Sequence, residues 1–328
     1  MTDSDLTEAL TQRGDLDGLL RLLDDLCDRG DWDEVLRLRR LSRAAIERGH
    51  QLWPAATHAE YRVALDAPGE WCAQVLDPDA GLFAWGPLTE VAASTHSWDA
   101  LSPYLEAGPG REQFALERVV RGEDLTGHGL EPGFHTDLPL RLMPWEPSYP
   151  LATYTTDEVT APAPDRPVGA PVTTVVPAGD AIDDPDGVSA LRAVVTHWIE
   201  RSNGRSEALA VAGDHRNALA ALGVPRPRVV EVPGATALAH VAWAAGSGGA
   251  HGRRRGMAAA RFEVWWLVTA LAGLSDDWPV DPDEMGEVVD ELRWFLWDAS
   301  EPETGWTLQF CVEDPADGLA WILSARDA

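Results

Sequence analysis

The sequence contains no lysine, so the basic side chains among its 328 residues are 26 arginines and nine histidines. A phosphate-loop lysine, a Schiff-base lysine, the strand lysine of protein kinases and a Ser–Lys pair all need that residue. P-loop NTPases, pyridoxal enzymes, ordinary protein kinases and the serine β-lactamase class are therefore excluded. The accompanying richness in Ala, Gly, Pro and Arg is typical of a GC-rich genome, which accounts for the missing lysine without a functional cause.

Several motifs that would indicate a particular chemistry are also missing. The three cysteines, Cys27, Cys72 and Cys311, form no CxxC pair and lie in apolar stretches, so we expect packed thiols in a reducing cytoplasm. There is no HExxH, no paired histidine spacing and no GxSxG, so the sequence predicts no metal site, no cofactor and no serine nucleophile. The polar, acidic N-terminus contains no signal peptide, which also favours the cytoplasm.

Acidic residues outnumber basic ones, and 54 Asp and Glu residues give a formal net charge of -28. Such a surface repels nucleic-acid phosphates and anionic membranes, so we expect neither as a partner. A solvated acidic surface, a basic protein partner and mimicry of nucleic acid all stay open. The long apolar run from Met257 to Leu274 is interrupted by Arg261 and Glu263, and we interpret it as a buried helix rather than a membrane span.

Residues 1–130 predict an all-helical domain. Leu19, Leu22, Leu23 and Leu26 recur at helical spacing before a stop at Gly30, and further helical stretches follow after breaks of a few residues. Short breaks are typical of antiparallel neighbours in a bundle or in an irregular helical repeat. The sequence shows no recurrence at the period of a regular tetratricopeptide array, so regular repeats are not predicted.

Proline crowds residues 131–171, which we interpret as a connector. Its first half carries aromatic side chains such as Phe134, Trp145 and Tyr149 and is too apolar for a free linker. We therefore expect that half to pack on a domain, and the part from Val159 to Pro171 to be more solvated.

Residues 172–328 predict a C-terminal domain of mixed type. The stretches PVTTVVPAG, EALAVAG and RPRVVEVPG have the pattern of strands separated by helices, an order that favours parallel pairing. The closing stretches RWFLWDA, GWTLQFCVED and GLAWILSARDA predict an antiparallel meander with turns at 301–305 and 314–318. The expected fold class is therefore mixed α+β, with an all-helical N-terminal domain followed by an α/β-type C-terminal domain that ends in this meander.

The strongest candidate site is the loop GSGGAHGRRRG at residues 246–256, directly before the helix expected from Met257. Its glycines let the backbone approach a ligand, and the free N–H groups and positive end of that helix face the loop. Three arginines at an end that is already positive violate the usual preference for acidic residues, and such violations collect at functional sites. A bound phosphate or carboxylate would resolve the conflict. The candidate ligand-binding residues are Gly248, Gly249, His251, Gly252, Arg253, Arg254, Arg255 and Gly256.

Two histidines lie in or near this loop. His251 is a candidate acid, base or hydrogen-bond donor to an anion. His240 lies among Ala, Leu, Val and Trp and is expected to be a satisfied core histidine instead. The alternative for the loop, which the abundance of acidic residues favours, is that its arginines pair with carboxylates of the same chain or lie in solvent.

Tryptophan is unusually frequent, with 15 residues. Most fall in elements that should form core, where packing is the default. Trp85, Trp98 and Trp145 lie near turns or in the connector. An exposed one would mark a partner surface, because Trp and Arg dominate interface hot spots.

Four stretches, GPLTEVAASTHSW, ERVVRGEDL, GGAHGRRRG and GWTLQFCVEDPADGLAWILSARDA, resemble an uncharacterised family of actinobacterial proteins with a domain of unknown function. The resemblance covers most of the chain and implies a bacterial cytoplasmic protein from a GC-rich actinomycete. It implies no activity and transfers no site residue.

Three functional hypotheses follow. The leading one is a non-enzymatic cytoplasmic protein whose helical domain engages a protein partner, as the helical N-terminal region, the acidity and the missing catalytic motifs favour. The second is a binder of a phosphate-bearing small molecule or similar anion at residues 246–256, with chemistry assisted by His251. The third is a mimic that blocks a nucleic-acid-binding protein with its acidic surface.

Overall fold

The computed structural model describes residues 2–76, 81, 84–130, 137–172, 176–224, 226–300 and 305–328. They form two compact units whose segments alternate along the chain. The helical unit consists of residues 1–119, 127–136 and 152–160, and the sheet unit of residues 120–126, 137–151 and 161–328. The described residues of the proline-rich segment 131–171 are thus shared between the two units.

Polar caps and glycine stops define the helices of the helical unit. Thr2 forms a capping box with Asp5 at the first helix, and Gly14 ends that helix in the left-handed conformation. Asp15 and Asp31 cap the next two helices. The elements are α1 (Asp3–Arg13), α2 (Leu16–Arg29), α3 (Trp32–Ala44), η1 (Ala45–Arg48), α4 (Trp53–Asp66), α5 (Gly69–Cys72), η2 (Ala73–Val75), α6 (Leu88–Thr95), α7 (Trp98–Leu101), η3 (Ser102–Tyr104) and α8 (Pro109–Val119).

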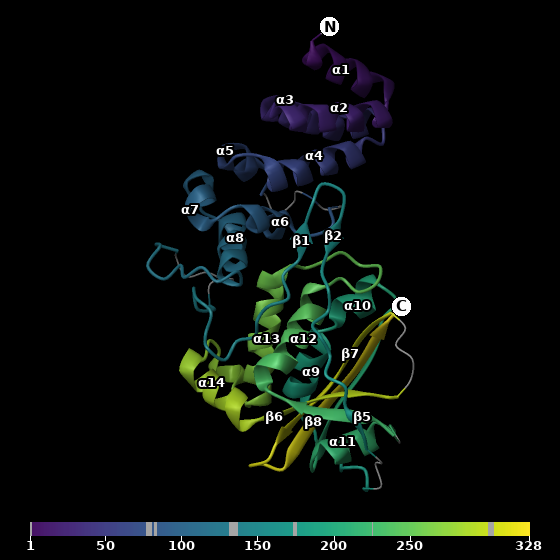
Figure 1. Cartoon of the computed structure of the whole chain (residues 1–328), viewed down its shortest axis with the longest axis vertical. Coiled ribbons are helices and arrows are strands. Elements are labelled where there is room, and N and C mark those ends of the chain that lie inside the picture. The colour runs from purple at the N-terminus through teal and green to yellow at the C-terminus, as the bar shows by residue number, and fades with distance from the viewer. Residues whose placement is uncertain are drawn as a thin grey trace. The chain divides into compact units, whose positions relative to one another are not determined.

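Each helix of this unit packs chiefly on helices one or two places away in the chain, as the succession from α1 to α8 in Figure 1 shows. The apolar face predicted around Leu19 and Leu26 is buried. A short hairpin of β1 (Thr153–Tyr154) and β2 (Val159–Thr160) belongs to the same unit. The Tyr154 hydroxyl donates a 2.6 Å hydrogen bond to Glu90 Oε2 and ties the hairpin to α6.

The sheet unit contains a six-stranded sheet in the order β3-β5-β6-β7-β8-β4, with antiparallel pairing between all neighbours. The predicted antiparallel meander of the last three strands is confirmed. The turn expected at 314–318 joins the last two strands, whereas residues 301–304 of the other turn lie outside the described residues. The strands are β3 (Ala170–Pro171), β4 (Arg205–Ala212), β5 (Arg228–Val232), β6 (Arg293–Asp298), β7 (Trp306–Asp314) and β8 (Leu319–Asp327).

The parallel pairing expected for an α/β-type domain is wrong, because β4 pairs with β8 and β5 with β6, both antiparallel. Strands β4 and β5 do run in the same direction, as a crossover through helix α11 (His215–Ala221) requires. The C-terminal meander lies between them and gives each an antiparallel partner. The strand predicted at 171–179 is described only in part, since residues 173–175 lie outside the described residues.

Helices cover both faces of this sheet (Figure 1). Over one face lie α9 (Pro185–Ala193), α12 (Gly234–Gly246) and α13 (Met257–Leu271), and they share a core with Leu308 and Phe310 of β7. Over the other face lies α11, packed on Cys311 and Ile322. The remaining helical elements of the sheet unit are α10 (Thr196–Arg201), η4 (Ser275–Asp277) and α14 (Pro282–Glu291).

The first half of the proline-rich segment packs as expected where it is described: Trp145 and Tyr149 are buried, whereas Phe134 lies outside the described residues. A fully buried ion pair joins Glu146 of this segment to Arg261 of α13, with Nε to Oε2 at 2.7 Å. The apolar run that begins at Met257 forms the buried helix α13, as predicted. Arg261 of α13 thus holds the proline-rich segment against this helix.

Candidate functional site

The predicted loop at 246–256 connects α12 to α13 and is held by its own chain. The Arg255 backbone N–H donates to the Gly246 carbonyl at 2.8 Å, which closes the loop at its base. The Ala250 N–H donates to Asp327 Oδ2 at 2.6 Å, and the His251 N–H donates to Ser202 Oγ at 3.1 Å. These bonds fix the loop without a ligand.

The glycines of this loop have a structural cause. A Cβ on Gly248 would collide with the carbonyl of Arg253, and one on Gly252 would collide with the carbonyl of Gly248. Gly249 has φ +78° and would also meet Asp327. Close backbone approach within the loop therefore accounts for the glycines.

The three arginines of the loop do not share one environment. Arg255 Nη1 lies 2.9 Å from Glu263 Oε1, so this arginine pairs with a carboxylate of the same chain. Arg254 is buried and Arg253 is half-buried, whereas the His251 side chain is exposed. The Gly256 N–H, predicted to cap an anion, donates to the Gly246 carbonyl at 3.3 Å. An anion site in this loop stays a prediction. The pair between Arg255 and Glu263 corresponds to the alternative, in which the arginines of the loop bind carboxylates of the same chain.

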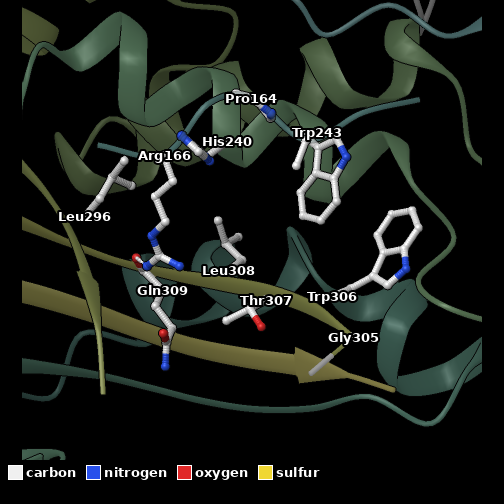
Figure 2. Close-up of a pocket in the computed structure, with 11 residues that line it drawn as sticks. Pro164, Arg166, His240, Trp243, Leu296, Gly305, Trp306, Thr307, Leu308 and Gln309 are labelled. Atoms are coloured by element: carbon white, nitrogen blue, oxygen red, sulfur yellow. Dashed lines mark hydrogen bonds between the residues drawn. The ribbon is translucent and has the colours of Figure 1, made fainter. Parts of the chain in front are cut away.

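A pocket of about 240 Å³ lies elsewhere in the sheet unit, between α12 and β7 (Figure 2). We call it the His240 pocket. In Figure 2 Arg166 and His240 lie on one side, Trp243 and Trp306 on the other, and Leu308 between them. The lining residues are Ala163, Pro164, Arg166, His240, Trp243, Leu296, Gly305, Trp306, Thr307, Leu308 and Gln309.

His240 is 7% exposed, as expected of a core residue, but the expectation that it is satisfied is wrong. Its ring hydrogen-bonds to the backbone of Asp165, while Nε2 is buried and has no hydrogen-bond partner among the described residues. Burial lowers the pKa of His240 to about 4, helped by the charge of Arg166 and opposed by the bond to Asp165. The imidazole is therefore neutral at neutral pH. An unpaired buried acceptor costs about 1–3 kcal/mol, so its retention here needs an explanation.

Arg166 enters from the proline-rich segment and spans the left side of the pocket in Figure 2. Its guanidinium donates to the carbonyls of Trp297 and Gln309, the latter at 3.4 Å. These carbonyls lie just beyond the last paired residues of β6 and β7, Leu296 and Phe310. Arg166 thus binds the two strands where their ladder ends, and its charge stays at the pocket.

Two stacked indoles form the opposite wall. The rings of Trp243 and Trp306 have centroids 4.8 Å apart and an interplanar angle of 12°. Trp198 contacts both edge-on, and its Nε1 donates to Ser247 Oγ at 2.9 Å. Trp243 Nε1 donates to the Ala161 carbonyl at 3.3 Å. The wall is rigid and apolar, because all these rings are held on several sides.

The helical unit contains a second concavity of about 190 Å³, which we call the aromatic hollow. Trp53 and Trp85 are 38% and 43% exposed. Of the three tryptophans singled out from the sequence, Trp85 is therefore exposed, whereas Trp98 and Trp145 are buried. The Tyr61 and Trp85 ring centroids lie 5.2 Å apart at 70°. The lining residues are Trp53, Pro54, Thr57, His58, Tyr61, Ala84 and Trp85.

Sequence reasoning identified few of these residues. It recognised Trp85 as a possible surface marker and His240 as buried, but gave no role to Arg166 or Trp306 in the pocket. Arg166 carried no signal because the surrounding prolines indicate a solvated connector. Trp306 begins a strand in which alternate residues face the helices. This pattern predicts on which face of the sheet Trp306 lies, but not that it stacks on Trp243.

No group of His, Cys, Asp and Glu among the described residues is arranged to hold a metal ion. The described helices include none whose length and hydropathy would let it span a bilayer. The three cysteines are buried free thiols, as expected.

The comparisons with known proteins give a family and no activity. A profile described as a family of unknown function (DUF6183) matches residues 17–328. No curated protein and no solved structure matches the chain. The match includes nearly all of both compact units, and it confirms the resemblance to a domain of unknown function that the sequence indicated. The chain therefore belongs to the family of unknown function DUF6183.

Proposed function

We propose that this chain is a protein-interaction protein whose helical unit binds a basic segment of a partner protein at the aromatic hollow. The observation that carries the proposal is the exposure of two tryptophans, Trp53 and Trp85, at one concavity. Exposed aromatic side chains gathered at a hollow are typical of interaction sites, and tryptophan is enriched among the residues that dominate binding energy.

The shape of the hollow suits one inserted side chain. Tyr61 and Trp85 stand at 70° to each other, and the His58 ring lies parallel to that of Tyr61 with centroids 6.5 Å apart. The Tyr61 hydroxyl donates to the Thr155 carbonyl, so this residue presents its ring and not its hydroxyl. The volume of about 190 Å³ is below the roughly 300–1,000 Å³ of drug-sized ligand sites.

Charge around the hollow favours a cation. The exposed Asp24 carboxylate lies 3.5 Å from His58 Nε2 and 3.0 Å from Arg62 Nη1, so it is partly balanced within the chain. The exposed Asp157 acts electrostatically on both His58 and Tyr61 and supplies further negative charge. Burial lowers the pKa of His58, partly offset by Asp24, so the ring adds little positive charge at neutral pH. A Lys or Arg side chain over tryptophan or tyrosine gains about 0.5–1 kcal/mol at exposed sites and about 2 when desolvated.

The charge of the whole chain supports a basic protein partner over a small cation. At -28 the formal net charge attracts an extended basic segment and raises its association rate. The hollow then supplies an anchor for one side chain, while the surrounding carboxylates contact the rest of the segment.

The test is a selection of short random peptides displayed on phage against the full chain, with counter-selection on Trp53→Ala/Trp85→Ala. Selected peptides should share a basic residue, and their affinity is measured by fluorescence anisotropy of the labelled peptide. Loss of a hot-spot tryptophan costs about 2 kcal/mol, or about 30-fold in Kd. Asp24→Asn should weaken binding at low salt and have less effect at high salt.

Tyr104→Ala and Ile46→Ala are matched controls, because these side chains are 52% and 47% exposed on the same unit and lie outside the hollow. They should leave the Kd unchanged. Peptides that bind the double tryptophan variant as well as the wild type, or that lack any shared basic residue, would contradict the proposal.

The anion site at residues 246–256 is the second candidate function, and three consecutive arginines directly before the first turn of α13 support it. A thermal unfolding screen with nucleotides, phosphosugars and simple anions tests it against Arg253→Ala/Arg254→Ala/Arg255→Ala. A ligand at about 100 times its Kd stabilises by about 2.7 kcal/mol. A shift in the wild type that is absent in the triple variant is expected if the site exists, and no shift with any compound would rule it out.

We place this interaction in the cytoplasm of an actinobacterial cell. Three buried free thiols are in keeping with a reducing compartment, and the composition is in keeping with a GC-rich genome. The packing of each helix on its near neighbours in the chain supports an irregular helical repeat as the scaffold of the hollow.

A further inference from the structure

His240 presents a hydrogen-bond acceptor to the pocket. The bond from its ring to the Asp165 backbone raises the pKa, as donation from a ring N–H to a carbonyl does. Nε2 is the nitrogen without a partner among the described residues, so we assign the ring proton to Nδ1. A neutral imidazole protonated on Nδ1 has its lone pair on Nε2. The free nitrogen therefore accepts and does not donate.

The other residues that line the pocket determine which shape and polarity a bound molecule can have. The Trp243–Trp306 pair and Leu308 provide an apolar wall opposite His240. The Nη2 nitrogen of Arg166 donates to two backbone carbonyls, which holds the charge of the guanidinium at the pocket. An electron-rich ring is favoured near that charge, and an ammonium group is disfavoured.

Size restricts the ligand further. About 240 Å³ is less than the roughly 300–1,000 Å³ of drug-sized ligand sites, so the molecule is smaller than such ligands. A ring system with one polar edge fits the separation of the polar side from the indole wall in Figure 2.

We propose that the His240 pocket binds a small planar heteroaromatic molecule, such as an indole or a nucleobase, whose ring N–H donates to His240 Nε2. The ring lies against the wall formed by Leu308 and the tryptophan pair, with its donor edge toward His240. The site is separate from the aromatic hollow, and each is supported by its own residues.

The experiment compares indole with 1-methylindole, and adenine with 9-methyladenine and 6-dimethylaminopurine, at up to millimolar concentration on the full chain. Saturation-transfer NMR gives the affinity, and the ¹⁵N signals of labelled histidine report the ring nitrogens. The wild type should show one neutral histidine protonated on Nδ1, whose Nε2 signal moves on binding. N-methylation of indole should weaken binding about tenfold, which corresponds to about 1.4 kcal/mol.

Two substitutions of His240 distinguish the effect of its hydrogen-bond acceptor from the effect of its ring shape. His240→Phe keeps an aromatic ring and loses the acceptor, so it should bind indole about tenfold more weakly and no longer distinguish it from 1-methylindole. His240→Gln restores an acceptor and should recover part of the difference. His251→Phe, on the exposed loop histidine, is the matched control and should change nothing.

Three results would overturn the inference. The first is binding of the N–H and N-methyl probes with equal affinity, and the second is binding unaffected by His240→Phe. The third is the absence of binding by every probe while the histidine spectrum shows the folded Nδ1 tautomer. The third result would leave Nε2 to a bound water, which needs no ligand site.

Discussion

The ion pair between Glu146 and Arg261 is the place where one conservative substitution should reduce stability most. Both side chains are 0% exposed, and Arg261 donates to both carboxylate oxygens at 2.7 Å. Glu146 also accepts from the Tyr149 hydroxyl at 2.6 Å and from the Met143 N–H at 3.0 Å. Burial alone would raise the pKa of Glu146, but the hydrogen bonds and charge of Arg261 outweigh it and lower that pKa. The carboxylate is therefore ionised and fully bonded.

Glu146→Gln replaces one oxygen by an NH₂ group that faces donors, and it leaves the Arg261 charge buried without a counterion. Breaking a buried pair in this way costs about 3–5 kcal/mol, a large part of the roughly 5–15 kcal/mol that stabilises a typical domain. Arg261→Met should cost a similar amount, since it leaves the carbonyls of Pro139 and Arg141 unpaired. The double variant Glu146→Leu/Arg261→Met should lose less than the sum, because no lone charge stays buried.

Urea unfolding followed by far-UV circular dichroism measures the free energy of unfolding. Hydrogen exchange of peptides from α13 and from residues 137–151 assigns the loss to the sheet unit, which is needed because two units need not unfold together. Glu231→Gln is the matched control: its partner Arg293 is 2.8 Å away, but the two side chains are 52% and 42% exposed. Its cost should stay below about 1 kcal/mol. A loss below about 1 kcal/mol in Glu146→Gln, or strict additivity in the double variant, would refute the reasoning.

Three more predictions concern the histidine, the loop and the thiols. Because the pKa of His240 falls from 6.5 to about 4 on folding, protonation favours the unfolded chain. The loss of stability between pH 6.5 and 4 should therefore be about 3 kcal/mol smaller in His240→Phe than in the wild type. Gly248→Ala should destabilise by about 1–3 kcal/mol in the same urea assay, since its Cβ meets the Arg253 carbonyl, and an unchanged midpoint would contradict this. Burial raises the pKa of Cys27 and Cys72 to about 12, so Ellman's reagent at pH 7 should label neither before unfolding.

The parts of the fold that sequence predicted are those set by local rules. Helix α2 begins at an Asp cap, repeats leucine at helical spacing and stops at Gly30, and all these signals lie within the helix and its flanks. The meander was equally local, since its strands follow one another and pair with their neighbours in sequence. The order of the remaining strands depended on which segment fills the space between β4 and β5. The crossover helix makes β4 and β5 run in the same direction, but it does not make them neighbours in the sheet, so the prediction of parallel pairing was wrong.

The candidate sites depended on contacts that no local pattern contains. The loop at 246–256 attracted notice because arginines at a helix start break a local rule, but Glu263, two turns into the same helix, supplies the negative charge for Arg255. The His240 pocket needed Arg166 and Trp306, which are 140 residues apart and meet only through the tertiary fold. The exposure of Trp53 against the burial of Trp98 likewise depends on which helices cover each ring.

The missing lysine has a structural counterpart in how the arginines are used. Arg166 binds the carbonyls at the fork of β6 and β7, Arg261 binds those of Pro139 and Arg141, and Arg111 binds those of Ser102 and Leu105. Each guanidinium joins two backbone carbonyls, and Arg261 does so through two different nitrogens, which a planar fork allows and a single ammonium does less well. The 54 acidic residues still exceed the 26 arginines by 28, and this excess of negative charge is the physical reason why we propose a basic partner for the helical unit.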